Sequence, residues 1–189
     1  DGWINATDWS PSVPFSAGAI MSTVGDLLKY QQAVFSSDKV NDNVRRLILS
    51  TDKLNDGTDV YYALGCLIRG ELDGHEKISH SGDVYGFASH YAYYPEDDVT
   101  VALLTNNQGA SVPPASIEHK FARVALGEDQ PVIKDEALSA KKLERYTGNF
   151  EIKRFEFGPP VYGFVAKDGK LHLQYAGIGS GAPLIPLLY

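Results

Sequence analysis

Two apolar runs joined by a short acidic turn constrain the fold of this chain more than any other feature of the sequence. Residues 86–94 and 99–106 are rich in aromatic and aliphatic side chains, and the turn Pro-Glu-Asp-Asp occupies residues 95–98 between them. Proline followed by acidic residues is typical of a tight turn, so the two runs are predicted to form a β-hairpin. The second run, VTVALLT, is apolar on both alternations, which favours a central strand covered on both faces.

Two further β runs precede this hairpin, at residues 61–69 and 76–81, and helical patterns lie before them. Thr23 and Asp26 have the spacing of a capping box at the start of the first helix. The run VRRLIL indicates a second, short helix within residues 42–49. The apolar stripe of the first helix is predicted to consist of Val24, Leu27, Leu28, Val34 and Phe35.

A third helix is predicted to open at Pro114 and to stop at Gly127, since proline suits a first helical position and glycine suits a C-cap. The order of elements is then helices, an antiparallel meander and a helix across it. This order predicts an α+β fold in which an antiparallel β-sheet is flanked by helices. The buried stripe of the third helix is predicted to consist of Ile117, Phe121, Val124 and Ala125.

A charged, proline-containing segment, EDQPVIKDEAL at residues 128–138, is predicted to be a linker after a first domain at residues 1–127. Beyond it, the helical run SAKKLERY leads into β runs joined by an Asp168-Gly169 turn. These features predict a small, incomplete β domain at residues 139–189. We expect both ends to be cuts in a longer protein, because the chain starts without Met and stops on an apolar run.

Charge and residue usage argue against several classes of function. The net charge is -7 and the basic residues are scattered, so neither nucleic acid nor an anionic membrane is an expected partner. No stretch approaches the ~20 apolar residues that span a bilayer. Cys66, the one cysteine, lies in an apolar run and is expected in the core. The five histidines lack metal-ligand spacing, so no metal or other cofactor is expected.

Three segments carry a family resemblance: SAGAIMSTVGDLLKY at 16–30, YYALGCLI at 61–68 and HSGDVYGFASHYAYYPEDDVTVALLTNN at 80–107. In this order and spacing they resemble the C-terminal part of the serine β-lactamase and D-alanyl-D-alanine-peptidase superfamily, in the branch that also contains esterases and D-aminopeptidases. The resemblance covers residues 15–127 and implies the C-terminal portion of the β-lactamase/transpeptidase-like fold. From LERYTGNFEI onward the chain resembles the small β-barrel-like domain that often follows such catalytic domains.

The tripeptide His80-Ser81-Gly82 matches the K-T-G or H-x-G motif that this family carries on the strand beside its cleft. Gly82 has no side chain, so an acyl substrate can approach the strand backbone closely. The resemblance implies that the backbone N–H of Asp83 is one of two oxyanion-hole donors. It also implies that His80 takes the cationic or proton-donating position and that the Ser81 hydroxyl steadies a substrate carboxylate. These four residues are the candidate catalytic residues.

The nucleophile of the family belongs to an S-x-x-K motif, which occurs here at residues 36–39, 50–53 and 139–142. None of the three is followed by the long apolar-periodic run of a buried helix, and the chain contains no Y-x-N. We therefore expect the nucleophile to lie before Asp1. The chain itself is then expected to be inactive, whereas its parent is expected to be an enzyme.

The first functional hypothesis is that the chain is a fragment of a serine hydrolase that acts on a β-lactam, a D-amino-acid peptide or an ester through an acyl-enzyme. The alternative is a non-catalytic module that binds peptide or glycan through the same cleft wall. Loss of the strands that precede the nucleophile would expose a sheet edge, which predicts a homodimer. The resemblance also implies a periplasmic or extracellular location in a bacterium.

Overall fold

The computed structural model describes residues 4–7, 10–65, 67–107, 112–132, 138–151, 161–175 and 185–186. The chain divides into two compact units, Asp1–Gln130 and Pro131–Tyr189, and the boundary falls within the segment read as a linker. The division into a catalytic part and a following β domain stays a prediction. Cys66 lies outside the described residues.

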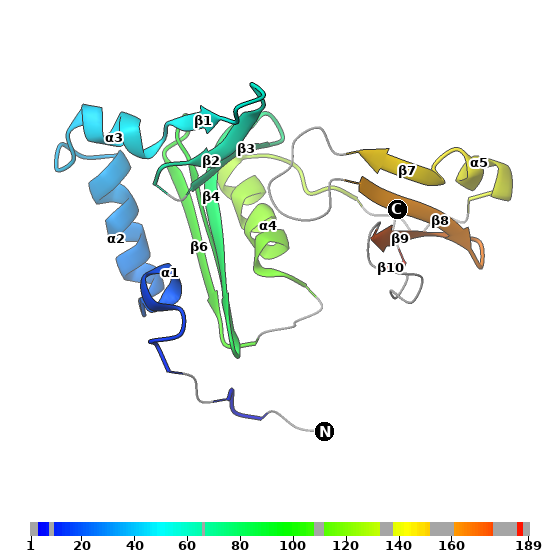
Figure 1. Ribbon diagram of the computed structural model, residues 1–189, viewed down its shortest axis with the longest axis horizontal. Helices are drawn as coiled ribbons and strands as arrows, with labels where there is room; N and C mark the ends of the chain where they lie inside the picture. Colours follow the sequence, from blue (N-terminus) through cyan, green and yellow to red (C-terminus); the bar gives the residue numbers. More distant parts are fainter. Residues whose placement is uncertain are drawn as a thin grey trace. The chain divides into compact units, whose positions relative to one another are not determined.

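The first unit is built on a six-stranded antiparallel sheet in which sequence neighbours pair in the order β1-β2-β3-β4-β5-β6 (Figure 1). The predicted hairpin around residues 95–98 is confirmed, because β5 and β6 pair from Tyr94 with Val99 to Ala88 with Thr105. The strands are β1 (Thr51–Lys53), β2 (Asp59–Ala63), β3 (Leu67–Leu72), β4 (His75–Val84), β5 (Phe87–Tyr94) and β6 (Val99–Thr105).

Two expectations about the strands were wrong. The run at 61–69 is not one strand, since a turn divides it into β2 and β3, which pair with each other. β6 is not central, because among the described strands it pairs only with β5 at the end of the order. Its apolar residues on both alternations are nevertheless explained, because α2 and α4 both pack on β6.

The described part of the first unit contains the helices α1 (Phe15–Gly18), α2 (Val24–Phe35), α3 (Asp42–Ile48) and α4 (Pro114–Leu126). The capping box of α2 is confirmed, since the Thr23 hydroxyl accepts the Asp26 N–H at 3.1 Å. Gly127 ends α4 with a φ of 78°, a left-handed C-cap that glycine adopts without strain. Among the described residues, no helix is long and apolar enough to cross a membrane.

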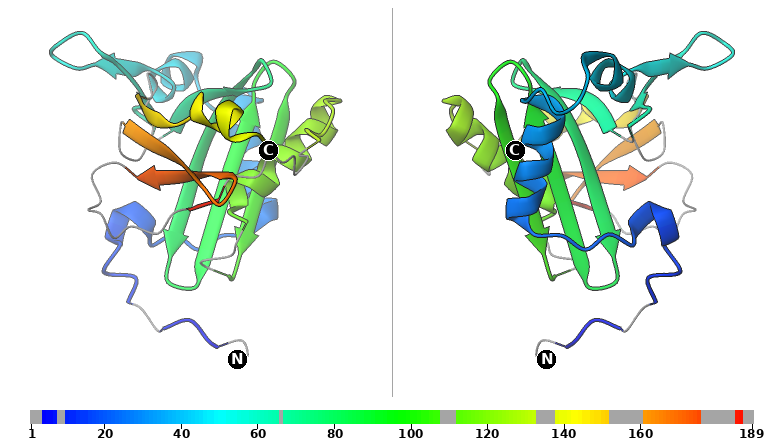
Figure 2. Two further views of the ribbon diagram at one scale, coloured as in Figure 1. Left: turned by 90° about the vertical axis from the view of Figure 1, so that its right-hand side faces the viewer. Right: turned by 90° about the vertical axis from the view of Figure 1, so that its left-hand side faces the viewer.

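The helices α2 and α4 cover opposite faces of the sheet (Figure 2). Phe35 of α2 stacks on Tyr93 of β5 with ring centroids 5.3 Å apart. The next residue, Tyr94, donates its hydroxyl hydrogen to Glu118 of α4. Because side chains alternate along a strand, the α2 face also holds Tyr91 and the α4 face also holds His90. Each residue of β4 can therefore be assigned to the α2 face or the α4 face through its partner on β5.

The buried stripe of α4 differs from the prediction. Glu118 and Ala122 are the buried positions, each with 0% of its surface exposed, whereas Phe121 and Val124 are 57% and 73% exposed. The helix turns Glu118, rather than its apolar stripe, toward the sheet, because polar side chains of the sheet bind the Glu118 carboxylate. A core cluster of Leu72, Ala92, Tyr94 and Ala122 packs beneath this face, with Val99, Val101 and Leu126 against it.

The second unit contains α5 (Ala140–Glu144) and a four-stranded antiparallel sheet in the order β10-β9-β8-β7. Asp168 and Gly169, with φ of 51° and 74°, form the predicted turn of the β8–β9 hairpin. With the first unit, this sheet confirms the α+β fold and the small β region. The strands are β7 (Gly148–Glu151), β8 (Val161–Lys167), β9 (Lys170–Tyr175) and β10 (Ile185–Pro186).

Candidate active-site wall

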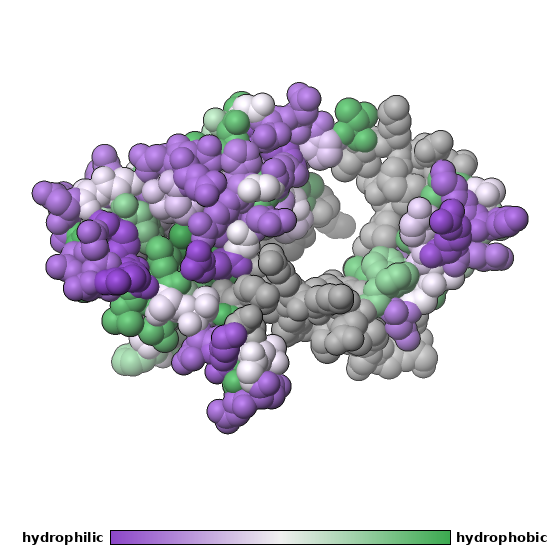
Figure 3. Space-filling model, turned by 90° about the horizontal axis from the view of Figure 1, so that it is seen from above, coloured by the Kyte–Doolittle hydropathy of each residue, from purple (hydrophilic) through white to green (hydrophobic). Residues whose placement is uncertain are grey.

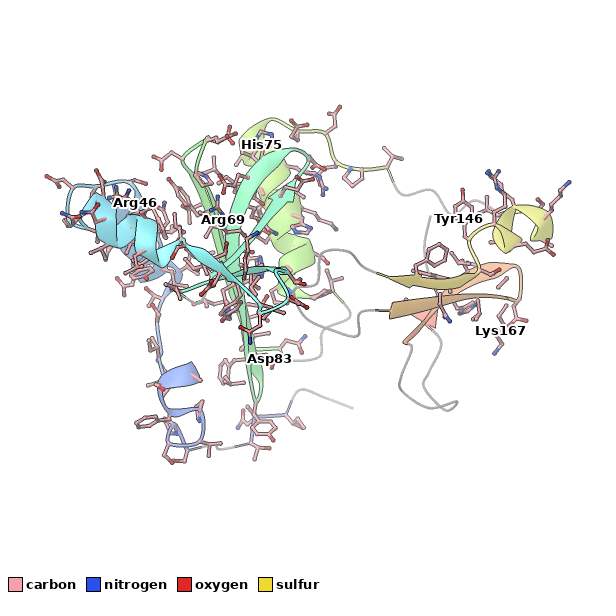
Figure 4. The ribbon with its side chains drawn as sticks, turned by 45° about the horizontal axis from the view of Figure 1, so that its top comes forward. Arg46, Arg69, His75, Asp83, Tyr146 and Lys167 are labelled. Atoms are coloured by element: carbon pink, nitrogen blue, oxygen red, sulfur yellow. The ribbon has the colours of Figure 1, made fainter. Side chains whose placement is uncertain are left out.

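The candidate residues lie on the second half of β4, beyond the point where β3 ends. β3 pairs with β4 from His75 to Ser79 and no further, whereas β5 pairs with β4 as far as Val84. Residues 80–84 therefore form a projecting hairpin arm with one side directed away from β5. Figure 4 places His75 and Asp83 toward opposite ends of this strand. An extended substrate that adds to a sheet edge needs a strand segment of this kind.

His80 lies on the α2 face, where Tyr62 of β2 holds its ring. The Tyr62 hydroxyl is 2.9 Å from His80 Nε2, and the two rings meet edge-on with centroids 5.7 Å apart. His80 Nδ1 is 2.6 Å from the Ser81 carbonyl oxygen, which can only accept, so Nδ1 carries a hydrogen. In the neutral ring Nε2 then accepts from the Tyr62 hydroxyl. In the imidazolium Nε2 donates to the Tyr62 oxygen, so the hydrogen bond between the two residues can form in either protonation state of His80.

Gly82 faces the same side as His80 and lies opposite Ser89 of β5. A Cβ at position 82 would approach Ser89 Oγ to 2.5 Å, and the Ser89 hydroxyl donates to the Gly82 carbonyl at 3.3 Å. The space above Gly82 is thus shared with the Ser89 side chain. A larger residue at position 82 would force the Ser89 hydroxyl to rotate away.

Ser81 and Asp83 face the opposite side of β4, toward α4. The Ser81 hydroxyl is 2.8 Å from Nδ1 of His90, its partner across the strands. Asp83 is exposed and pairs with Ala88 in the hairpin. The four candidate residues are consecutive on one strand, but only His80 and Gly82 face the α2 side of the sheet.

None of the three S-x-x-K serines lies at the start of a buried helix. Ser36 is the C-cap of α2 and donates to Asp98 at 2.7 Å. Ser50 follows α3 and donates to the Leu47 carbonyl at 2.8 Å, and Ser139 is the N-cap of the short helix α5 in the second unit. The hydroxyls of Ser36 and Ser50 therefore have local structural roles, whereas Ser139 makes no side-chain cap hydrogen bond. Among the described residues, no group of three or more His, Cys, Asp or Glu side chains could hold a metal ion.

Several residues of this region were not identified from the sequence: Tyr62, Ser89, His90 and Glu118. Their roles depend on strand register and on the rotation of α4, neither of which a local motif encodes. The one available signal was the alternation in GFASHYAYY, which puts Ser89 and His90 on opposite faces of a strand. His90 was expected to be structural.

The comparison with known families agrees with this arrangement. The family model described as Beta-lactamase matches residues 2–123. The chain belongs to the beta-lactamase family. The match ends within α4, so it covers the six-stranded sheet and most of its flanking helices. The resemblance inferred from residues 15–127 is confirmed.

Two relatives extend the comparison of this beta-lactamase-family chain. Penicillin-binding protein 4* of Bacillus subtilis (strain 168) is 22% identical over 139 residues, which are 70% of this chain and 31% of that protein. The octameric penicillin-binding protein homologue from Pyrococcus abyssi shares the fold, with a TM-score of 0.50 and 21% identity over 88% of this chain and 37% of its own. The chain thus spans about a third of the length of these relatives.

Proposed function

We propose that this chain supplies the substrate-facing wall of a serine hydrolase that acts through an acyl-enzyme. Membership of the beta-lactamase family indicates serine-hydrolase chemistry on small acyl substrates. The observation that carries the proposal is the projecting segment 80–84, where His80 is held by Tyr62 beside Gly82. A wall of this kind combines a backbone edge for the substrate with a side chain that can supply a proton or a positive charge.

In the proposed reaction, the substrate lies along the edge of β4 with its carbonyl oxygen toward the backbone N–H of Asp83. That N–H stabilises the oxyanion that forms when a serine attacks. His80 and Tyr62 provide the positive charge or the proton for the leaving group. Water then hydrolyses the acyl-enzyme. The attacking serine is proposed to lie outside the described residues, because the hydroxyls of Ser36 and Ser50 donate to other groups and Ser139 lies in the second unit.

The test is acylation by benzylpenicillin and hydrolysis of p-nitrophenyl acetate. Both are measured on this chain and on the full gene product that contains it. We expect no penicillin adduct on the chain alone and an active full product. His80→Ala in the full product should lower kcat/KM by about 100-fold, the usual contribution of one acid–base group. Penicillin bound to Ser36, Ser50 or Ser139 would contradict the proposal, as would an inert full product.

A non-catalytic binding module remains the second candidate, favoured by the positions of the three S-x-x-K serines. In that case the wall at residues 80–84 holds an extended peptide or a glycan by its backbone edge. Titration of the full gene product with a D-Ala-D-Ala peptide distinguishes the two. Binding without any acyl adduct or turnover supports the module, and turnover supports the hydrolase.

We also propose that the chain self-associates and that its parent works outside the cytoplasm of a bacterium. The homodimer proposal rests on the end of the sheet at β6, which carries exposed apolar side chains. The location rests on the likeness to a protein named as a penicillin-binding protein. Fractionation of cells that express the tagged full gene product tests the location, and recovery in the cytoplasmic fraction alone would contradict it.

A further inference from the structure

A second network of reactive groups lies on the α4 face of the sheet. Ser81 is exposed, and its Oγ is 2.8 Å from Nδ1 of His90. His90 is only 5% exposed, and its Nε2 is 3.5 Å from Oε2 of Glu118. Glu118 is completely buried. A hydroxyl, an imidazole and a carboxylate thus follow one another from the surface to the interior.

The Glu118 side chain is ionised in this setting. Burial raises its pKa, but hydrogen bonds from His90 and Tyr94 and the charge of Lys77 outweigh burial, so the pKa lies below its usual range. The Tyr94 hydroxyl donates to Oε1 at 2.7 Å, and Lys77 Nζ is 3.5 Å from Oε2. A carboxylate with these partners is stable in the interior, and it can only accept hydrogen bonds.

The hydrogen that faces Glu118 comes from His90 rather than from His119. His119 Nε2 is 3.0 Å from the Lys77 ammonium, which donates, so that nitrogen is an acceptor and has no hydrogen to give to the carboxylate. Burial, followed by the charge of Lys77, lowers the pKa of His119 and keeps its ring neutral. His90 Nε2 and Glu118 Oε2 are both buried and 3.5 Å apart, and within the described part of the chain neither has a hydrogen-bond partner of good geometry. A hydrogen on Nε2, directed at Oε2, is the tautomer that lets these two buried atoms satisfy each other.

This placement fixes the direction of the hydrogen bond at Ser81. A neutral imidazole with its hydrogen on Nε2 has a bare Nδ1, which accepts from the Ser81 hydroxyl. Ser81 Oγ then turns its lone pairs toward solvent while its proton points at a base. Nucleophile, base and a carboxylate that orients the base are the three parts by which a serine is activated.

We propose that Ser81, His90 and Glu118 form a reactive serine site that accepts an acyl or phosphonyl group from small activated esters and fluorophosphonates. In the step with a fluorophosphonate, Ser81 Oγ forms a bond to phosphorus as its proton moves to His90 Nδ1. The P–F bond breaks, fluoride leaves, and His90 releases the proton to water. With an ester, Ser81 Oγ forms a bond to the carbonyl carbon, the ester C–O bond breaks, and the same proton passes from His90 to the leaving alkoxide. Glu118 stabilises the imidazolium that exists between these events.

Ser81 belongs to segment 80–84, but this site uses the opposite face of β4 from His80 and Gly82. Ser81 and His90 face α4, whereas His80, Tyr62 and Gly82 belong to the other face of β4. Labelling of Ser81 is measured on the 189-residue chain and needs no other serine. The result of penicillin acylation of the full gene product therefore neither supports nor contradicts the proposal for Ser81.

The experiment treats the chain with a fluorophosphonate, follows its intact mass and maps the labelled peptide. We expect one adduct, on Ser81, and its loss in Ser81→Ala. His90→Asn should slow labelling by about 100-fold, because general-base assistance is worth at least that factor in a positioned site. Glu118→Gln, which keeps the shape but removes the charge, should slow it by about 10-fold. Ser116→Ala changes an exposed serine of α4 and should leave the rate unchanged.

A second measurement holds even where the Glu118 or His90 variant fails to fold. The nitrogen spectrum of the wild-type chain labelled with ¹⁵N identifies which ring nitrogen of His90 carries hydrogen. Hydrogen on Nε2 with a bare Nδ1 supports the site. Hydrogen on Nδ1 alone, no adduct on Ser81, or a labelling rate that His90→Asn leaves unchanged would each overturn it.

Discussion

Gly82 and Ser89 share one small volume between neighbouring strands, and this sharing can be tested residue by residue. Gly82→Ala puts a methyl group where Ser89 Oγ now lies, at 2.5 Å from the ideal Cβ. We expect the free energy of unfolding to fall by about 0.5–1.5 kcal/mol, because Ser89 must leave its present rotamer and lose its hydrogen bond to the Gly82 carbonyl. Ser89→Ala removes Oγ, and Gly82→Ala should then cost much less in that background. Urea denaturation of the two single variants and the double variant measures the coupling. Equal effects of Gly82→Ala in both backgrounds would show that the two side chains do not compete.

The candidate residues differ in how much the sequence could say about them. His80, Ser81 and Gly82 were found because a consecutive tripeptide is a local signal. Tyr62 and Ser89 act on this tripeptide from other strands, so their identity depends on register, which was not fixed by the sequence alone. Glu118 was missed for a different reason. A buried acid is identified only through its partners, and these come from β4 and β5.

At the scale of elements, the apolar pattern of α4 predicts the wrong buried face. Its apolar side chains at 121 and 124 are exposed, while Glu118 and Ala122 face the sheet. Ala122→Leu should therefore lower the free energy of unfolding by about 1–3 kcal/mol through overpacking. The matched change Ala125→Leu, at an exposed position of the same helix, should stay within about 0.5 kcal/mol of wild type. Urea denaturation compares the two. A larger loss of stability for Ala125→Leu than for Ala122→Leu would contradict this placement and support the apolar stripe predicted from the sequence.

His75 joins three elements at the end of β4 that lies away from the candidate wall. Its Nδ1 is 2.8 Å from Asp97 in the β5–β6 turn, and its Nε2 is 3.3 Å from Glu128 just after α4. The hydrogen bond with Asp97, followed by that with Glu128, raises the pKa of His75 against the opposing effect of burial. Protonated His75 therefore stabilises the connection between these elements.

The pH dependence follows from the sign of this shift. A histidine whose pKa is raised on folding adds stability fully below its unfolded value of about 6.5, and this contribution disappears as the pH rises through the folded value. His75→Gln should therefore reduce the free energy of unfolding most near pH 5.5 and least above pH 8, as estimated from those values. Denaturation across this range checks the trend, and Asp97→Asn should weaken it. A loss that grew with pH would rule out this role of His75.

At the scale of the whole molecule, the sheet of the first unit ends at β6 with apolar surface beside it. Among the described strands β6 pairs only with β5, and Leu104 of β6 is 43% exposed. Leu104 is opposite Ser89, so it lies on the α2 face, where Val24 and Leu28 of α2 are also exposed. Figure 3 shows apolar side chains gathered on the side of this unit where α2 lies. An unpaired edge flanked by such side chains favours association with another strand.

The occupant we propose for this edge is β6 of a second copy, paired antiparallel about a twofold axis, because such a contact closes on itself. Light scattering on the eluting chain should give twice the 20.6 kDa of one copy, with the monomer appearing on dilution. Leu104→Lys puts a charge at the contact and should shift the equilibrium toward monomer by at least about 10-fold. The control variant Leu54→Lys, at an exposed leucine between β1 and β2, should leave this equilibrium unchanged. A chain that stays monomeric at every concentration would mean that this edge is not paired by a second copy, and a dimer indifferent to Leu104→Lys would place the contact elsewhere.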